Sequence, residues 1–107
     1  MKFGLLVRIE AKPEYADQVA AMLRDAAKLA AQEQHTVTWY SFRQDTTTFG
    51  VFDTFNDEQG RNGHLSGQIA AALMKAAENN MISAPVITPV DLLGVKVPDQ
   101  DALRSLD

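Results

Sequence analysis

The chain has 107 residues, a net charge of -4 at pH 7 and no cysteine. This length fits a single domain, and the lack of cysteine excludes disulfides, thiolate nucleophiles and iron–sulfur clusters. An acidic chain without a cluster of Lys and Arg is not typical of nucleic-acid binding. No apolar run approaches the roughly 20 residues of a membrane span. We therefore expect a cytoplasmic protein that binds neither nucleic acid nor membrane.

The first half of the chain predicts a strand, a helix and a hairpin. Residues 2–10 alternate between apolar and other side chains, which indicates a strand, and residues 13–33 carry apolar side chains at helical spacing. Residues 36–44 and 48–55 are rich in β-branched and aromatic side chains. The polar residues 45–47 can join these two strands in a tight turn.

The predicted hairpin turn also sets the register of its two strands. If Gln44 faces Thr48, counting back along both strands places Trp39 opposite Asp53. A slip of one residue would move these side chains to the other face of the sheet, and the sequence leaves that alternative open.

The second helix is expected to begin with Asn56 as its N-cap. Each glycine inside a helix costs up to about 1 kcal/mol relative to alanine, so the glycines that follow predict a break near Gly63. His64 then lies at the break, and residues 68–78 continue the helix. Two prolines precede residues 90–97, which we expect to form the fourth strand.

The predicted order of elements is β-α-β-β-α-β, which is the order of an α+β, ferredoxin-like fold. We expect an antiparallel sheet with two helices on one face, formed by residues 1–97, and a C-terminal tail over residues 98–107. The open face of the sheet would carry Tyr40 and Phe42. Such a face is more apolar than a monomer usually exposes, which predicts a homodimer through it; half-exposed surface aromatics are the alternative.

The segment TFGVFDTFNDEQGRNGHLSG and the proline-rich approach to VDLLGVKV resemble the antibiotic biosynthesis monooxygenase (ABM) domain family. The resemblance covers about residues 2–97. It implies a dimeric α+β barrel with a small pocket between helices and sheet in each subunit. In some members this pocket oxidises quinols or polycyclic phenols without a cofactor.

The family pattern has an acidic residue late in the third strand, an aromatic residue two positions later and a His-x-x-Ser in the second helix. Asp53, Phe55 and His64 match these positions, although Ser66 comes one position early. Haem-degrading relatives use an Asn, a Trp and a His. This chain has Val7 and Phe55 at the first two places and keeps only His64, which argues against haem degradation.

Physical reasoning gives the candidate residues their roles. An unpaired buried carboxylate is costly, so Asp53 needs a donor such as the Trp39 indole, Arg8, Arg43 or His64. A carboxylate that orients or charges an imidazole beside an aromatic cleft could remove a phenolic proton. We therefore predict catalytic roles for His64 and Asp53. The predicted substrate-binding residues are Trp39, Phe55, Val7 and Phe49.

Simpler roles remain open for three of these residues. Asp53 could bond to backbone or water, His64 could pack or cap a helix, and Trp39 could belong to the core or to a dimer interface. The two histidines are 29 positions apart, so no metal site is expected.

The predicted function is a cofactor-independent monooxygenase that uses O2 to oxidise a quinol or phenolic aromatic. One alternative is a non-enzymatic, small-ligand-binding or stress-associated dimer. A lactone isomerase or decarboxylase of the same superfamily is the other, because a fold alone does not determine its chemistry.

Overall fold

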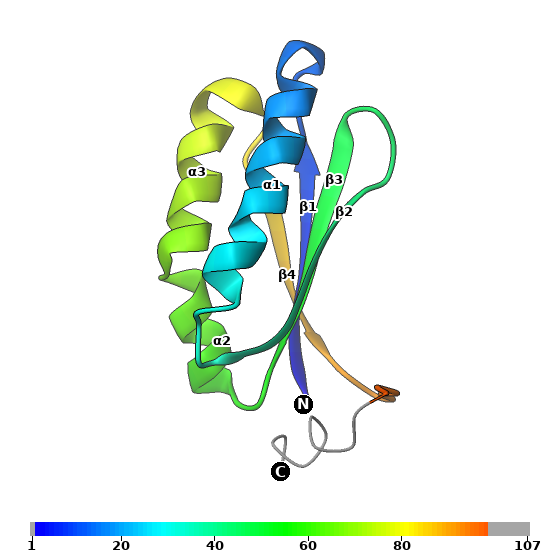
Figure 1. Cartoon of the computed structure of the whole chain (residues 1–107), viewed down its shortest axis with the longest axis vertical. Helices are drawn as coiled ribbons and strands as arrows, with labels where there is room; N and C mark the ends of the chain where they lie inside the picture. The colour runs from blue at the N-terminus through cyan, green and yellow to red at the C-terminus, as the bar shows by residue number, and fades with distance from the viewer. Residues whose placement is uncertain (1, 99–107) are drawn as a thin grey trace.

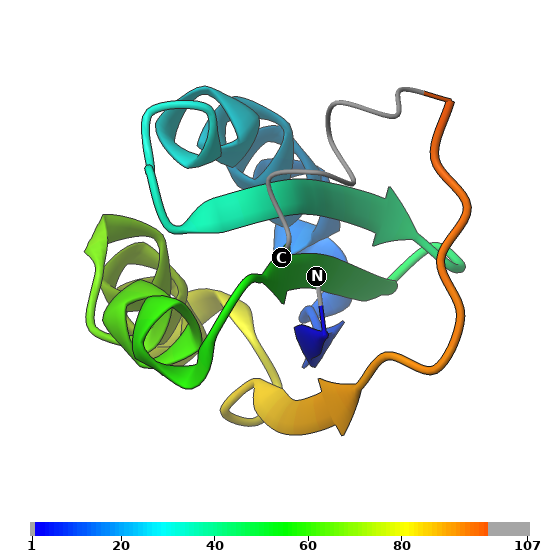
Figure 2. The same cartoon turned by 90° about the horizontal axis from the view of Figure 1, so that it is seen from below.

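The computed structural model describes residues 2–98. Its elements, in chain order, are β1 (Phe3–Glu10), the short 3-10 helix η1 (Pro13–Tyr15), α1 (Ala16–Ala30), β2 (Thr36–Arg43), β3 (Thr48–Phe55), α2 (Glu58–Leu65), α3 (Gln68–Asn80) and β4 (Val86–Asp91). The four strands form one antiparallel sheet in the order β2-β3-β1-β4. The helices cover one face of this sheet (Figure 1, Figure 2). This arrangement confirms the predicted α+β, ferredoxin-like fold.

The register of the β2–β3 hairpin is also as predicted. Trp39 pairs with Asp53, and Arg43 pairs with Phe49. Side chains alternate along a strand, so the helices are faced by Phe49, Val51 and Asp53 of β3. The core is formed by the following residues on that side of the sheet and on the helices: Val7, Ile9, Ala11, Ala16, Val19, Leu23, Ala26, Ala30, Phe49, Val51, Ile69, Leu73 and Met81.

The prediction for the last strand was wrong in its bounds. We expected residues 90–97, whereas β4 runs over Val86–Asp91 and includes Pro89, which pairs with Leu5. Proline lacks an N–H group, but β4 is an edge strand and has a neighbour on one side alone. The proline therefore fits inside the strand instead of preceding it. Of the predicted tail, residues 99–107 lie outside the described residues.

The second predicted helix is divided into α2 and α3. Asp57, not Asn56, is the N-cap of α2, and its carboxylate accepts a hydrogen bond of 2.7 Å from the Gly60 N–H. The break falls at Ser66 and Gly67, whereas we expected it near Gly63 with His64 at the break. The Ser66 hydroxyl closes the last turn of α2 by donating to the Gly63 carbonyl at 3.1 Å.

The open face of the sheet carries exposed aromatic side chains, as predicted. Tyr40 is 56% exposed and Phe42 is 43% exposed. The Phe42 ring lies over Gly50, where a Cβ atom would be 2.2 Å from the ring, so a larger residue there would displace the ring. Figure 2 shows the helices on one side of the sheet and the segment after β4 on the other. Among the described helices, none is long and apolar enough to cross a membrane.

Candidate functional site

Asp53 lies near the end of β3 on the face that the helices cover, and it is 0% exposed. Its neighbours across the sheet are Trp39 on β2 and Leu5 on β1. A carboxylate in such apolar surroundings is unfavourable unless a charge or a hydrogen-bond donor compensates it. The position of Asp53 therefore requires a partner from the helical layer.

His64 in the last turn of α2 supplies that partner. Its Nε2 atom lies 2.7 Å from Asp53 Oδ2, and the side chain is 7% exposed. The imidazole also contacts the Phe55 ring, with ring centroids 5.3 Å apart and the planes tilted by 47°. Because Asp57 caps α2 and thereby fixes its start, His64 projects from the final turn toward the sheet. The structure thus brings His64, Asp53 and Phe55 together.

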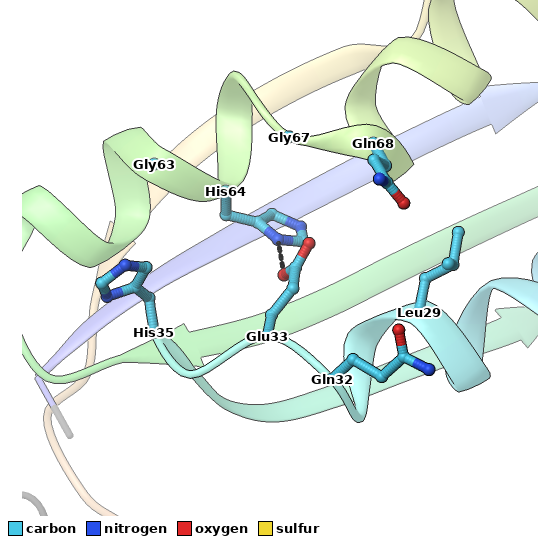
Figure 3. A pocket seen from close by; sticks show the side chains of 8 residues that line it. All are labelled: Leu29, Gln32, Glu33, His35, Gly63, His64, Gly67 and Gln68. Carbon is cyan, nitrogen blue, oxygen red and sulfur yellow. Dashed lines mark hydrogen bonds and ion pairs between the residues drawn. The ribbon is translucent and has the colours of Figure 1, made fainter.

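The opposite nitrogen of His64 contacts a residue that the sequence did not indicate. Nδ1 of His64 lies 2.6 Å from Oε2 of Glu33. The dashed line in Figure 3 marks this contact. The Thr36 hydroxyl donates to the same Glu33 oxygen at 2.7 Å. The sequence suggested that Glu33 ends the first helix, whereas α1 ends at Ala30 and the following turn carries Glu33 to the imidazole. No local signal in the sequence could have indicated this contact.

Two carboxylates therefore flank one imidazole. A carboxylate accepts hydrogen bonds and cannot donate them, so the arrangement favours the imidazolium form with a proton on each nitrogen. Burial by itself lowers the pKa of His64, but the contact with Asp53 and its charge, followed by those of Glu33, outweigh burial. The net result is a pKa of His64 raised above its ordinary value of 6.5. His64 is thereby better suited to stabilise negative charge than to accept a proton.

The two arginines that we considered as partners of Asp53 bond elsewhere. Arg8 donates to the Gln44 side chain at 3.2 Å, and Arg43 forms an ion pair with Asp17 at 3.3 Å. Both contacts lie at the surface. His64 is therefore the candidate cation that reaches Asp53.

A small internal cavity of about 20 Å³ lies beside Asp53 and His64. Two of the predicted substrate-binding residues, Val7 and Trp39, line it. Phe55 contacts the His64 ring from the sheet. Phe49 does not belong to this site, because its ring lies farther along β3 with the Arg43 guanidinium 5.0 Å from its centre. The full lining is Leu5, Val7, Trp39, Val51, Asp53, His64, Leu65, Ile69, Ala70, Leu73, Met74, Pro85 and Ile87.

Two buried polar atoms of residues that line this cavity have unused bonding capacity. Within residues 2–98, the Trp39 Nε1–H and Asp53 Oδ1 are buried without a hydrogen-bond partner. The other Asp53 oxygen, Oδ2, forms the ion pair with His64 Nε2. The cavity volume is close to that occupied by one water molecule. One hydroxyl group could accept from the indole and donate to the carboxylate.

A second, open pocket of about 340 Å³ lies on the Glu33 side of His64, between the end of α1 and the α2–α3 junction (Figure 3). His35, Gln32 and Gln68 contribute polar side chains to it. His64 therefore lines both the small cavity on its Asp53 side and the open pocket on its Glu33 side. Among the described residues, no three His, Cys, Asp or Glu side chains are grouped as metal ligands.

The fold and this site can now be compared with known proteins. No protein-family model and no curated protein sequence matches the chain. A solved structure of a protein of unknown function from Nitrosomonas europaea is 47% identical, with a TM-score of 0.88 over 92% of this chain and 95% of that one. At this identity and coverage, the chain belongs to the same family as that protein.

Solved structures of antibiotic biosynthesis monooxygenases share the fold. One is 16% identical with a TM-score of 0.73, over 86% of this chain and 99% of that chain. Another, from Caulobacter crescentus and described as a proposed monooxygenase of this type, is 21% identical with a TM-score of 0.73, over 87% and 91% of the two chains. The chain thus has an ABM-like fold, which confirms the resemblance noted in its sequence.

Proposed function

We propose that the protein is a cofactor-independent monooxygenase that binds the hydroxyl group of a quinol or phenolic aromatic beside Asp53. One observation carries this proposal: Asp53 and Trp39 line the same cavity, and within residues 2–98 neither Asp53 Oδ1 nor the Trp39 indole N–H has a hydrogen-bond partner. A phenolic hydroxyl has the donor and the acceptor that these two groups need. Perturbed or unpaired polar groups of this kind in a cavity are typical of functional sites.

The proposed chemistry begins with a proton transfer. Asp53 accepts the phenolic proton, the O–H bond breaks, and its electron pair stays on the phenolate oxygen. The Trp39 N–H and the positive charge of His64 stabilise this anion without rearrangement, as preorganised donors do in many enzymes. Asp53 is therefore the proposed base, and His64 supplies charge instead of accepting the proton.

The oxidation then balances without a further reductant. The phenolate gives electrons to O2; one oxygen atom becomes a new carbonyl at a ring carbon that carried hydrogen, and the other leaves as water. A phenol that becomes a quinone in this way gains one oxygen and loses two hydrogen atoms: the phenolic proton held by Asp53 and the ring hydrogen both enter the water, which returns Asp53 to its carboxylate. The substrate supplies all four electrons, so no metal or flavin is needed as a source of electrons.

The size of the cavity favours a second candidate function. A volume of about 20 Å³ accommodates one hydroxyl group but not an aromatic ring, so a ring must displace side chains at the cavity wall. Leu65 and Met74 are exposed wall residues, and methionine adapts readily to new shapes. If these side chains stay in place, the protein is a non-enzymatic dimer in which the Asp53–His64 pair is part of the packing.

The homodimer is also proposed to form through the open face of the sheet. Tyr40 and Phe42 are exposed there, with Val86 of β4 on the same face. Burying these groups against a second copy would remove apolar surface from water, which is a main source of dimer stability.

Oxygen uptake by the metal-free protein, measured with a panel of reduced quinols and polycyclic phenols, tests the proposed function. We expect uptake by the wild type, its loss in Asp53→Asn and its retention in Asp17→Asn. Asp17 is the matched control because the same change is made on an exposed carboxylate of α1. Circular dichroism checks that both variants are folded.

Two results would count against the proposal. A wild type that consumes no oxygen above buffer with any compound would favour the binding function. Full turnover by folded Asp53→Asn would remove Asp53 from the mechanism.

A further inference from the structure

Glu33, His64 and Asp53 form a row that runs from the surface to the interior. The exposed fraction of the side chain is 24% for Glu33, 7% for His64 and 0% for Asp53. The imidazole contacts Glu33 through Nδ1 and Asp53 through Nε2, at 2.6 and 2.7 Å. Glu33 does not reach the cavity beside Asp53, so it can influence that cavity only through His64.

Glu33 is held in place by its own surroundings. The Thr36 hydroxyl donates to Oε2 at 2.7 Å, and the Glu33 N–H donates to the Ala30 carbonyl at 3.1 Å in the turn that ends α1. An exposed glutamate usually samples many rotamers, which weakens its ion pairs. The first bond holds the Glu33 oxygen that faces His64, and the second holds the Glu33 backbone, so both reduce that loss.

The glycines around His64 allow this close approach. Gly60, Gly63 and Gly67 lie near the segment 33–35, which passes beside α2. A Cβ atom at Gly60 would be 3.3 Å from His35 Cβ, and one at Gly67 would be 3.4 Å from Glu33 Oε1. The first distance is shorter than most contacts of a Cβ atom, and the second is at the short end of ordinary contact. Glycine therefore lets residues 33–35 approach α2 closely enough for Glu33 to reach the ring.

We infer that Glu33 is a positioning residue of the buried site: by binding His64 Nδ1 it holds a protonated imidazole against Asp53 and keeps positive charge beside the cavity. The inference deepens the function proposed above and rests on it for its catalytic meaning. Without Glu33, the ring would lose one of two anionic partners and could turn its Nδ1 toward the open pocket. Asp53 would then be the one remaining carboxylate that stabilises the positive charge of the His64 imidazole.

The groups that face His64 support this assignment. Asp53 and Phe55 face the ring from β3, while Glu33 and Thr36 face it from the connection between α1 and β2. The nearest cation on α2, Arg61, forms an ion pair with Glu58 at 3.6 Å. Glu33 is therefore the charged group through which the solvent-facing pocket can affect the imidazole.

NMR of the full chain with ¹⁵N-labelled histidine tests the inference directly. The ring nitrogen shifts report the charge and the tautomer of His64 as the pH is varied. In Glu33→Gln we expect the midpoint of the His64 titration to move to lower pH and Nδ1 to lose its protonated signal first. Glu58→Gln is the matched control, because it removes the same charge from an exposed position on α2 and should leave the His64 titration unchanged.

A second variant distinguishes the effect of holding Glu33 in position from the effect of its charge on His64. Thr36→Val keeps the Glu33 charge but removes the hydroxyl that holds it, so a smaller shift of the His64 midpoint in the same direction is expected. An unchanged midpoint in folded Glu33→Gln would overturn the inference.

The failure of the inference and that of the proposed function are distinguishable, because the titration needs no substrate. A shifted midpoint in a protein that consumes no oxygen would support the role of Glu33 and reject the monooxygenase. If oxygen uptake is found, its pH profile should shift in Glu33→Gln as the His64 titration does. A profile that stays unchanged would overturn the positioning role.

Discussion

Replacing His64 by leucine should destabilise the protein far more than replacing a histidine at the surface would. His64 is 7% exposed, and the Asp53 carboxylate 2.7 Å from its Nε2 is 0% exposed. Leucine fills a similar volume but leaves this carboxylate buried without its cation. Removing one partner of a buried ion pair typically costs about 3–5 kcal/mol. The total free energy of unfolding of a natural domain is about 5–15 kcal/mol, so a large share would be lost.

The double variant Asp53→Val/His64→Leu makes the prediction specific. Replacing both partners of a buried ion pair by apolar groups is often neutral or stabilising. Valine also suits a strand, and the adjacent cavity of about 20 Å³ leaves room for it. We therefore expect the double variant to recover most of the stability that His64→Leu loses. Asp53→Val alone should cost less than His64→Leu, because a buried imidazole can release its proton.

Urea unfolding at pH 7, followed by circular dichroism, measures these four proteins. The free energy of unfolding comes from linear extrapolation, and equal slopes show that the unfolding transition is comparable. If His64→Leu unfolds within about 1 kcal/mol of the wild type, or the double variant is no more stable than His64→Leu, the description of Asp53 and His64 as a buried ion pair would be wrong.

Three further predictions concern pH, the glycines and the open sheet face. Because the pKa of His64 is raised on folding, the stability that His64 contributes is fully present below the unfolded pKa of about 6.5 and is lost as the pH rises through the folded pKa. The free energy of unfolding of the wild type, measured by urea titration, should therefore fall over that pH range relative to that of the double variant. Parallel curves of the two proteins against pH would contradict this. Gly63→Ala should be tolerated and could stabilise α2 by up to about 1 kcal/mol, since its Cβ would be 3.7 Å from His35. Gly67→Ala should lower the melting temperature, because its Cβ would be 3.3 Å from the His64 carbonyl oxygen and 3.4 Å from Glu33 Oε1; equal melting temperatures would refute the packing argument. Light scattering should find a dimer in the wild type and a monomer in Tyr40→Lys/Phe42→Lys, and a monomeric wild type at micromolar concentration would exclude the open-face interface.

The hairpin register was predictable because local chemistry determines it. Asp45 accepts hydrogen bonds from the backbone N–H groups of Thr47 and Thr48, at 3.0 and 2.8 Å. These bonds, first that from Thr47 and then those from Thr48, lower the pKa of Asp45 from its ordinary value of 3.8. They also fix a three-residue turn. Once the turn is known, alternation along the strands places Trp39 opposite Asp53.

The contact of Glu33 with His64 was not predictable in the same way. It joins residues 31 positions apart, and it depends on α1 ending at Ala30 and on α2 approaching the turn through glycine. A helical pattern in the sequence marks the approximate extent of a helix but not its last turn. The bounds of β4 failed for a related reason. Proline usually interrupts a strand, and its acceptance here depends on β4 lying at the sheet edge.

Packing alone does not account for Asp53. A valine at this position would fill the helix-facing side of β3 without a desolvated charge, and buried ion pairs seldom improve stability over apolar residues. The chain instead lines one small cavity with Asp53, His64 and Trp39, and within residues 2–98 it leaves Asp53 Oδ1 and the indole N–H without a hydrogen-bond partner. Burying such polar groups without partners is unfavourable, and the ligand hydroxyl of the proposed function would supply the missing bonds. Oxygen uptake tests whether such a ligand is converted by O2.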